Sequence, residues 1–97
     1  MATYISLINW TEQGIRAFAD TVQRANAVKE FAQRMGGSIP HMYWTVGQYD
    51  IVTVGEFPDE ETGTAFLLAL GAQGNVRTTT LRAFDTKEIT AIIGKLG

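Results

Sequence analysis

Two runs of β-forming residues, 42–46 and 51–57, are separated only by the short segment Gly47-Gln48-Tyr49-Asp50. Short connections that contain glycine between such runs predict a β-hairpin, because glycine adopts the positive φ angles that tight turns need. We therefore expect antiparallel strands at about 39–46 and 49–57. Pro40 has no backbone N–H to donate, so it favours an edge position for the first of these strands. The rest of the chain must then supply strands beside this hairpin and helices that cover one of its faces.

Two further strands and a long helix follow from residue periodicity. Residues 3–9 and 76–84 are rich in β-branched and aromatic residues and predict strands. Apolar residues at three- and four-residue intervals predict a helix over about 17–35, preceded by a turn that Thr11 caps. Gly36-Gly37 is expected to end this helix, because glycine takes the left-handed cap conformation at the lowest steric cost.

Two more helices complete the expected element order. Pro58-Asp59 predicts the start of a helix over about 60–73, with Asp59 as its N-cap, and residues 86–96 predict a short amphipathic helix. The order strand, helix, strand, strand, helix, strand, helix is that of a ferredoxin-like βαββαβ unit with a C-terminal helix. We expect one α+β domain over residues 1–97, with a four-stranded antiparallel sheet and both main helices on one face.

The other face of this sheet is expected to be apolar and uncovered. From the alternation of residues we place on it Tyr4, Ile8, Tyr43, Ile51, Phe57, Val76 and Phe84. Such a face is an association surface, and a second copy of the chain is the simplest partner. The sequence thus predicts a homodimer or a higher homo-oligomer.

The composition excludes several other kinds of partner. The formal net charge of −2 gives no electrostatic reason to expect binding to nucleic acid or to an anionic membrane. There is no cysteine and only one histidine, His41, so we expect no metal site, no disulfide and no cofactor. No apolar run approaches the length of a membrane span and no signal peptide is recognised, which predicts a cytoplasmic protein.

Tyr49 and Asp50 follow a turn glycine and allow two interpretations. Asp50 could act as a general base at the mouth of a cleft, with Tyr49 as a hydrogen-bond donor. Alternatively, Gly47 supplies a positive φ angle, Asp50 caps the turn and Tyr49 packs. His41 and Tyr43 are expected on the face away from the helices, where His41 is either a base in a dimer cleft or solvent-exposed.

Arg82 is the sharpest functional hint in the chain. Alternation places it on one face with Thr78 and Thr80, opposite Leu81 and Ala83, which we expect to pack against the helices. A guanidinium beside hydroxyl groups suits an anionic or carboxylate ligand. The competing interpretation is an ion pair or hydrogen bonds with a partner subunit.

The segment Tyr43-Trp44-Thr45-Val46-Gly47-Gln48-Tyr49-Asp50-Ile51-Val52 resembles the signature of the GYD-domain family, which comprises small bacterial and archaeal proteins. Residues 11–16 and 71–84 fit the same family, so the resemblance spans nearly the whole chain. Gln48, between Gly47 and Tyr49, is a minor departure. The resemblance implies a ferredoxin-like fold of the dimeric α/β-barrel type. It implies no activity, because relatives of this fold include cofactor-free monooxygenases, isomerases and plain ligand binders.

The leading functional hypothesis is a homo-oligomeric protein that binds a small organic or anionic molecule in a cleft between paired sheets. The candidate ligand-binding residues are His41, Tyr43, Tyr49, Asp50, Thr78, Thr80 and Arg82. One alternative is a cofactor-independent isomerase or monooxygenase that uses His41, Tyr43, Asp50 or Arg82. Another is a structural or regulatory assembly subunit whose sheet face is filled by its partner.

Overall fold

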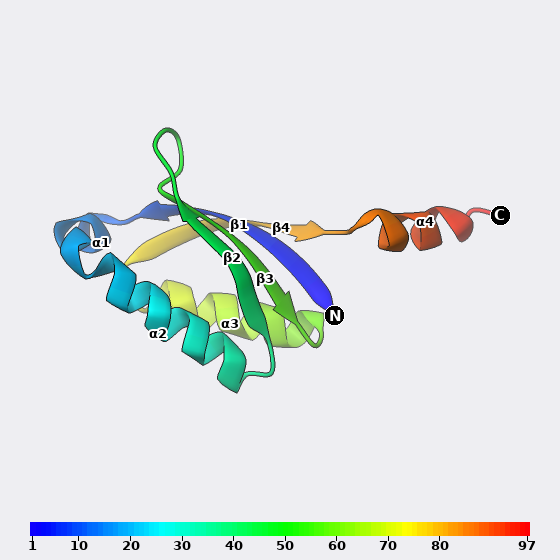
Figure 1. The fold of residues 1–97 in the computed structure, drawn as a ribbon, viewed down its shortest axis with the longest axis horizontal. Coiled ribbons are helices and arrows are strands. Elements are labelled where there is room, and N and C mark those ends of the chain that lie inside the picture. Colours follow the sequence, from blue (N-terminus) through cyan, green and yellow to red (C-terminus); the bar gives the residue numbers. More distant parts are fainter.

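Four strands and four α-helices make up the computed structural model, which describes all 97 residues. The elements in chain order are β1 (Ala2–Trp10), α1 (Glu12–Arg16), a 3-10 turn (Phe18–Asp20), α2 (Thr21–Arg34), β2 (Ser38–Trp44), β3 (Ile51–Phe57), α3 (Glu60–Ala72), β4 (Val76–Ala83) and α4 (Thr86–Gly94). The strands form one antiparallel sheet in the order β2-β3-β1-β4. Helices α2 and α3 lie on one side of this sheet (Figure 1). The predicted α+β class and βαββαβ order are confirmed.

The segment before α2 differs from the expected continuous helix over 17–35. Thr11 caps the separate short helix α1 by accepting a hydrogen bond from Gly14 N, and a 3-10 turn then leads into α2. The reason is the close approach of the backbone of α1 to the segment after α3. A Cβ atom on Gly14 would lie 1.9 Å from the carbonyl oxygen of Asn75, so only glycine fits there. The contact fixes α1 beside Asn75, which lines a cavity between the sheet and the helices.

The boundaries of the other elements follow the sequence signals. Asp59 caps α3, because its side chain accepts a hydrogen bond from the backbone N–H of Thr62 at 2.7 Å. This bond holds the pKa of the Asp59 carboxyl below its ordinary value of 3.8. Gly36 ends α2 with a φ of 83°, and Gly47 in the β2–β3 connection has a φ of 139°. Strand β2 is an edge strand, as Pro40 predicts, with a register shift between Ser38 and His41.

The prediction of which strand residues face the helices is wrong for most of the expected bare face. Ile8, Ile51 and Phe57 are buried under the helices, and Tyr4 packs against the hydrophobic core. The core centres on Phe57 and Phe66, whose ring centroids are 4.9 Å apart, with Ala32 of α2 beside them. Because side chains alternate along a strand, placing one residue on the wrong side inverts the whole strand.

The uncovered sheet face is nevertheless apolar at its centre, but this centre is built from the other set of residues, and Glu56 and Arg77 lie toward the ends of the same face. Strand pairing brings Ile5 of β1 next to Val54 of β3 and Leu81 of β4, and Leu7 next to Val52. None of these five side chains is fully buried, and Leu81 is 48% exposed. We call this surface, Ile5, Leu7, Val52, Val54, Leu81 and the flanking Tyr43, the bare sheet face.

Candidate functional site

The residues proposed from the sequence as a ligand site lie in three separate places. His41 and Tyr43 are on the bare sheet face, Tyr49 and Asp50 precede β3, and Thr78, Thr80 and Arg82 are on the helix side of β4. No cavity of the molecule is lined by any of these seven side chains. The constellation expected from the sequence is therefore not assembled within one chain.

Asp50 secures the end of the β2–β3 connection. Its Oδ2 accepts a hydrogen bond from the backbone N–H of Trp10 at 2.9 Å, and its own N–H donates to the carbonyl of Ile8. The Tyr49 carbonyl accepts a hydrogen bond from Thr45 Oγ1. These bonds tie the end of the hairpin loop to β1, so the Asp50 carboxylate binds a backbone N–H of the neighbouring strand rather than capping the turn itself.

Arg82 faces the helices, so the prediction that Leu81 and Ala83 pack on that side is wrong. Its guanidinium lies 5.6 Å from the ring centroid of Tyr4 and donates hydrogen bonds to the backbone carbonyls of Thr3 and Ala83. Its Nε also pairs with Glu60 Oε1 of α3 at 3.3 Å. Arg82 thus clamps the end of the sheet to the start of α3.

Thr78 and Thr80 lie on the same side of β4 as Arg82. The hydroxyl groups of Thr80 and Ser6 are 3.0 Å apart, and Thr80 Oγ1 donates to Thr78 Oγ1 at 3.3 Å. The three hydroxyls satisfy one another within the sheet–helix layer. Arg82, Thr78 and Thr80 thus share one face of β4, as predicted, but they do not line an open pocket.

His41 and Tyr43 are on the side away from the helices, as predicted. Their rings are nearly parallel, with an interplanar angle of 8° and centroids 6.4 Å apart. Both side chains are exposed at the β2 edge of the bare sheet face. They are available to a second molecule that covers this face.

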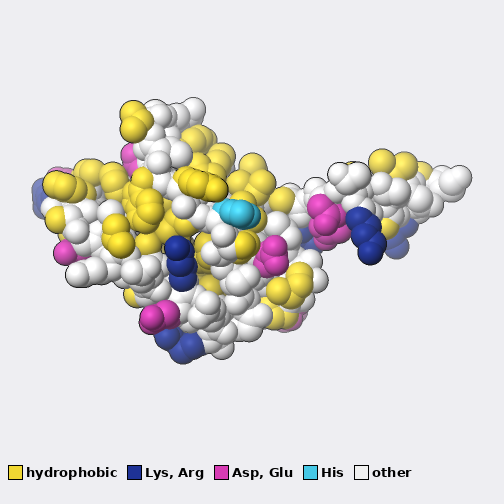
Figure 2. Space-filling view, in the orientation of Figure 1, with side chains coloured by type: hydrophobic (Ala, Val, Ile, Leu, Met, Phe, Trp, Pro, Cys, Tyr) yellow, Lys and Arg dark blue, Asp and Glu magenta, His cyan; other side chains and the backbone are white.

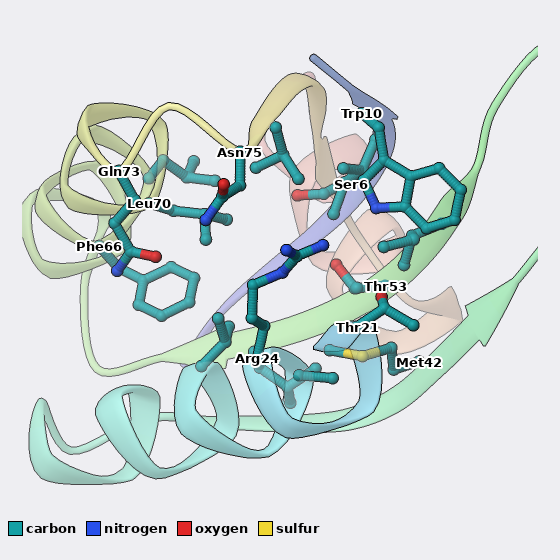
Figure 3. A pocket seen from close by; sticks show the side chains of 17 residues that line it. Ser6, Trp10, Thr21, Arg24, Met42, Thr53, Phe66, Leu70, Gln73 and Asn75 are labelled. Carbon is teal, nitrogen blue, oxygen red and sulfur yellow. The ribbon is translucent and has the colours of Figure 1, made fainter. Parts of the chain in front are cut away.

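A cavity of about 70 Å³ lies between the sheet and the two helices α2 and α3, rather than between two sheets (Figure 3). A buried water needs roughly 10–15 Å³ of such space, so the cavity has room for several water-sized groups. Most of its lining is apolar. The lining includes Ile8, Ala25, Val28, Ile39, Met42, Ile51, Phe66, Leu67, Leu70 and Val76.

The polar side chains of the cavity gather at its Arg24 end. In Figure 3 the Arg24 side chain extends from α2 toward Asn75 and Ser6, with Trp10 and Gln73 on either side. Its Nη1 donates to the Ala17 carbonyl at 3.1 Å and its Nη2 to the Gly14 carbonyl at 3.2 Å. The α1 segment therefore holds the guanidinium in place.

Arg24 is the one charged residue in the cavity lining, and it has no acidic partner. The two ion pairs of the molecule are Arg16–Glu12 and Arg82–Glu60. Two of the guanidinium donors bind carbonyls, which leaves its other N–H groups without a protein acceptor. Asn75 Oδ1 accepts a hydrogen bond from Gln13 Nε2 at 2.9 Å, so the Asn75 amide N–H groups are also available. Positive charge and free donors thus meet an apolar cavity.

A groove between α2 and α3 continues from this cavity. It shares Arg24, Val28, Gln73 and Asn75 with the cavity, and Arg34 and Phe31 lie farther along α2. The guanidinium carbon of Arg34 is 5.7 Å from the ring centroid of Phe31. No Asp or Glu lines either the cavity or the groove, so the positive charges of Arg24 and Arg34 are uncompensated there.

Arg24 is absent from the candidates found by sequence because the helix pattern places it on the polar face. It stands four residues before Val28 and three after Thr21, and all three line the cavity. Residues at these spacings lie on the same side of a helix. This spacing could have indicated that Arg24 faces the same cavity as Val28 and Thr21. An arginine at the edge of an apolar stripe, however, ordinarily extends into solvent.

Two other properties of the molecule bear on its function. No three His, Asp or Glu side chains come together in a way that could hold a metal ion. No helix has the length and apolar character needed to cross a lipid bilayer.

Comparison with known proteins identifies the family. No solved structure gives a significant match. A protein of Thermus thermophilus, described as a glutamine synthetase and cystathionine beta-lyase binding protein, is 30% identical over 92 residues. This alignment covers 94% of the present chain and 97% of that relative. The family model of the GYD domain matches residues 4–93, so the chain belongs to the GYD-domain family.

Proposed function

We propose that the protein is a homo-oligomeric binding protein whose sheet–helix cavity takes a small molecule with an apolar body and an anionic end. The observation that carries this proposal is Arg24, a charged side chain without an acidic partner at the polar end of an otherwise apolar cavity. Apolar pockets with a few converging polar groups are the usual form of small-molecule sites.

A carboxylate is the anion that fits these donors best. A guanidinium presents N–H groups in a planar fork that matches the two oxygens of a carboxylate. The Asn75 amide supplies a further donor at the same end, while Val28, Phe66 and Leu70 offer an apolar wall for the body of the ligand. A charge-assisted hydrogen bond contributes about 1.5–3 kcal/mol, so Arg24 is expected to favour a carboxylate over its neutral amide by roughly 10- to 100-fold.

The proposal is tested by calorimetric titration with matched pairs of probes, benzoate with benzamide and phenylacetate with phenylacetamide. The wild-type protein is expected to bind the carboxylates more tightly than the amides. Arg24→Met keeps the apolar stem and should remove this preference, because the donor fork is gone. Arg34→Met serves as the control, since Arg34 lines the groove but not the cavity. Equal affinity for acids and amides in the wild type would contradict the proposal.

The oligomer is proposed to form through the bare sheet face. Ile5, Val54 and Leu81 lie in adjacent strands and present a continuous apolar surface that no element of the chain covers. Sedimentation velocity at micromolar concentration should give at least twice the mass of the 10.6 kDa chain. Leu81→Asp should shift the protein toward the monomer, because the charge would be buried in the interface.

Binding of another protein is a second candidate function. It is supported by the description of the Thermus relative, which names two enzymes as binding partners of that protein. Co-sedimentation of the present protein with purified glutamine synthetase or cystathionine beta-lyase tests this candidate directly. A complex that persists in Arg24→Met would place the contact outside the cavity and separate the two functions.

A further inference from the structure

The C-terminal helix α4 has an apolar side that its own chain leaves uncovered. Figure 1 shows α4 extending from the end of β4, away from the sheet and from α2 and α3. Its apolar side chains and that of Leu96, in the turn after its last residue, recur at the spacing of one helix face, and all are exposed: Ile89 by 41%, Ile92 by 40%, Ile93 by 60% and Leu96 by 89%. We call these four side chains the arm stripe.

A helix of this length needs a surface to pack on. With nine residues, α4 is shorter than the roughly 12–15 residues at which an isolated helix becomes even marginally stable in water. Its N-terminus has a complete capping box, in which Asp85 and Glu88 each bind the other's backbone N–H. The cap fixes where the helix begins. The arm stripe supplies the apolar surface that a partner must cover.

The chain holds α4 away from its own sheet. Only Phe84 and Asp85 separate β4 from α4, and Asp85 has an extended backbone with ψ of 179°. The guanidinium carbon of Arg82 lies 4.5 Å from the ring centroid of Phe84, and the same guanidinium binds the carbonyls of Thr3 and Ala83. The exit of the arm is therefore anchored to the end of the sheet, in line with β4.

Hydrophobic atoms of the projecting arm and the bare sheet face are seen on the same side of the molecule. In Figure 1, α2 and α3 lie below the sheet, and the β2–β3 connection rises on the opposite side. Figure 2 shows hydrophobic atoms along the upper side of the projecting arm and both acidic and basic side chains toward its lower side. A molecule that covers the bare sheet face and extends past the end of β4 would also meet the arm stripe.

We propose that α4 is an exchanged arm, which packs its stripe of Ile89, Ile92, Ile93 and Leu96 on a second copy of this chain bound at the bare sheet face. This inference rests on the proposed oligomer and assigns it a second contact. In a two-fold dimer each copy both gives and receives an arm, so the contact closes on itself.

The area of the bare sheet face supports this assignment. Four strands of seven to nine residues, spaced about 4.8 Å apart, have a footprint of roughly 440–500 Å², so two paired sheets cover about 900–1,000 Å² in total. Stable specific interfaces bury about 1,200–2,000 Å². Two helices about 14 Å long and 10 Å wide, packed on partner surfaces, bring the total to roughly 1,400 Å². The arms thus add roughly half as much again to the footprint of the paired sheets and bring it into the range of stable interfaces.

The charge of α4 does not favour a membrane as the surface that it covers. Lys87 and Lys95 are balanced by Asp85 and Glu88, so the arm has no net positive charge to attract anionic lipid. A lipid surface is therefore the competing outcome of the test rather than the expected one.

The test compares two aspartate substitutions at neighbouring positions of the full-length chain. Ile92→Asp places a charge in the arm stripe, whereas Ala91→Asp places the same charge on the other side of α4 and serves as the matched control. Sedimentation equilibrium should show the dimer Kd of Ile92→Asp raised by at least about 10-fold, because each substitution occurs twice per dimer. Ala91→Asp should leave the Kd within about threefold of the wild type. Circular dichroism checks that the monomers remain folded.

Hydrogen exchange of the wild-type protein provides a second readout that needs no variant. The α4 amides should be protected at concentrations well above the dimer Kd and lose this protection when the protein is diluted below it. A wild-type monomer at all concentrations would refute the oligomer itself. A wild-type dimer that Ile92→Asp leaves unchanged would refute only the exchanged arm. Binding to vesicles of phosphatidylcholine and phosphatidylglycerol that Ile92→Asp abolishes, without any change in the dimer, would likewise overturn the proposal.

Discussion

Gly63 of α3 offers a direct test of how β1 faces the helices. Gly63 is buried, and a Cβ atom added to it would lie 2.6 Å from Cε2 of Tyr4 and 3.2 Å from its Cζ. The Tyr4 ring has little room to move, since Phe57 lies 6.4 Å from it and the Arg82 guanidinium 5.6 Å from it. Gly71 is in the same helix and exposed, and its Cβ would meet nothing within 4 Å. The two glycines form a matched pair.

The expected effect of Gly63→Ala is the balance of two opposing terms. Alanine is better than glycine in a helix interior by up to about 1 kcal/mol, which is the gain expected for Gly71→Ala in open space. At Gly63 the same gain is offset by overpacking against Tyr4, which typically costs about 1–3 kcal/mol. The free energies of unfolding of the two variants should therefore differ by roughly 1–3 kcal/mol, with Gly63→Ala the less stable.

Thermal and urea unfolding at one fixed protein concentration measure this difference, because an oligomer makes the Tm concentration-dependent. For a domain of this size 1 kcal/mol corresponds to about 4–8 °C in Tm. The double variant Tyr4→Leu with Gly63→Ala should recover much of the loss relative to Tyr4→Leu alone, since the flat ring is gone. If Gly63→Ala raised the Tm as much as Gly71→Ala, Tyr4 would not lie against α3 and the assigned facing of β1 would be wrong.

Three further predictions concern single side chains. Gly47→Val should lower stability by about 1–3 kcal/mol in urea unfolding, because a β-branched residue is strained at its φ of 139°, and a neutral result would show that the loop relaxes. Arg82→Met should lower the free energy of unfolding by about 1–3 kcal/mol, because the hydrogen bonds to the carbonyls of Thr3 and Ala83 are lost. It should leave the binding of carboxylate probes unchanged. If binding were lost while stability was unchanged, the ligand site would lie at Arg82 on β4. The pKa of Asp59 is lowered, so its contribution to stability is complete above pH 3.8 and is lost as the pH falls through the folded-state value. Asp59→Asn keeps a capping side chain but cannot titrate, so its Tm should fall less steeply between about pH 5 and pH 3, and an unchanged slope would speak against the cap.

The order and boundaries of the elements were largely set by local sequence signals. Turn glycines with positive φ angles, the capping side chain of Asp59 and the edge position of Pro40 all lie where the sequence predicted them. Each depends on the backbone conformation of a few neighbouring residues, so the sequence alone was enough to predict them. The exception is the segment 12–20, where the contact between Gly14 and Asn75 breaks the expected helix.

The facing of the strands was decided only by tertiary structure. In β1 both alternating sets are apolar, since Tyr4 and Ile8 form one set and Ile5 and Leu7 the other. Period-two alternation identifies the sets but not which of them the helices cover. That choice depends on how side chains pack between the sheet and the helices, for example on the packing of the Tyr4 ring against Gly63 of α3.

The candidate site shows the same division. The sequence placed arginine, threonine and histidine residues on shared strand faces, but Arg82 is occupied by Glu60 and by backbone carbonyls. Arg24 became a candidate because the carbonyls of Gly14 in α1 and of Ala17 just after it hold its guanidinium, and because it forms no ion pair with a carboxylate. The sequence by itself determined the local conformation of the chain, whereas the tertiary structure decided which charges are compensated, because compensation depends on contacts between residues that are distant along the chain.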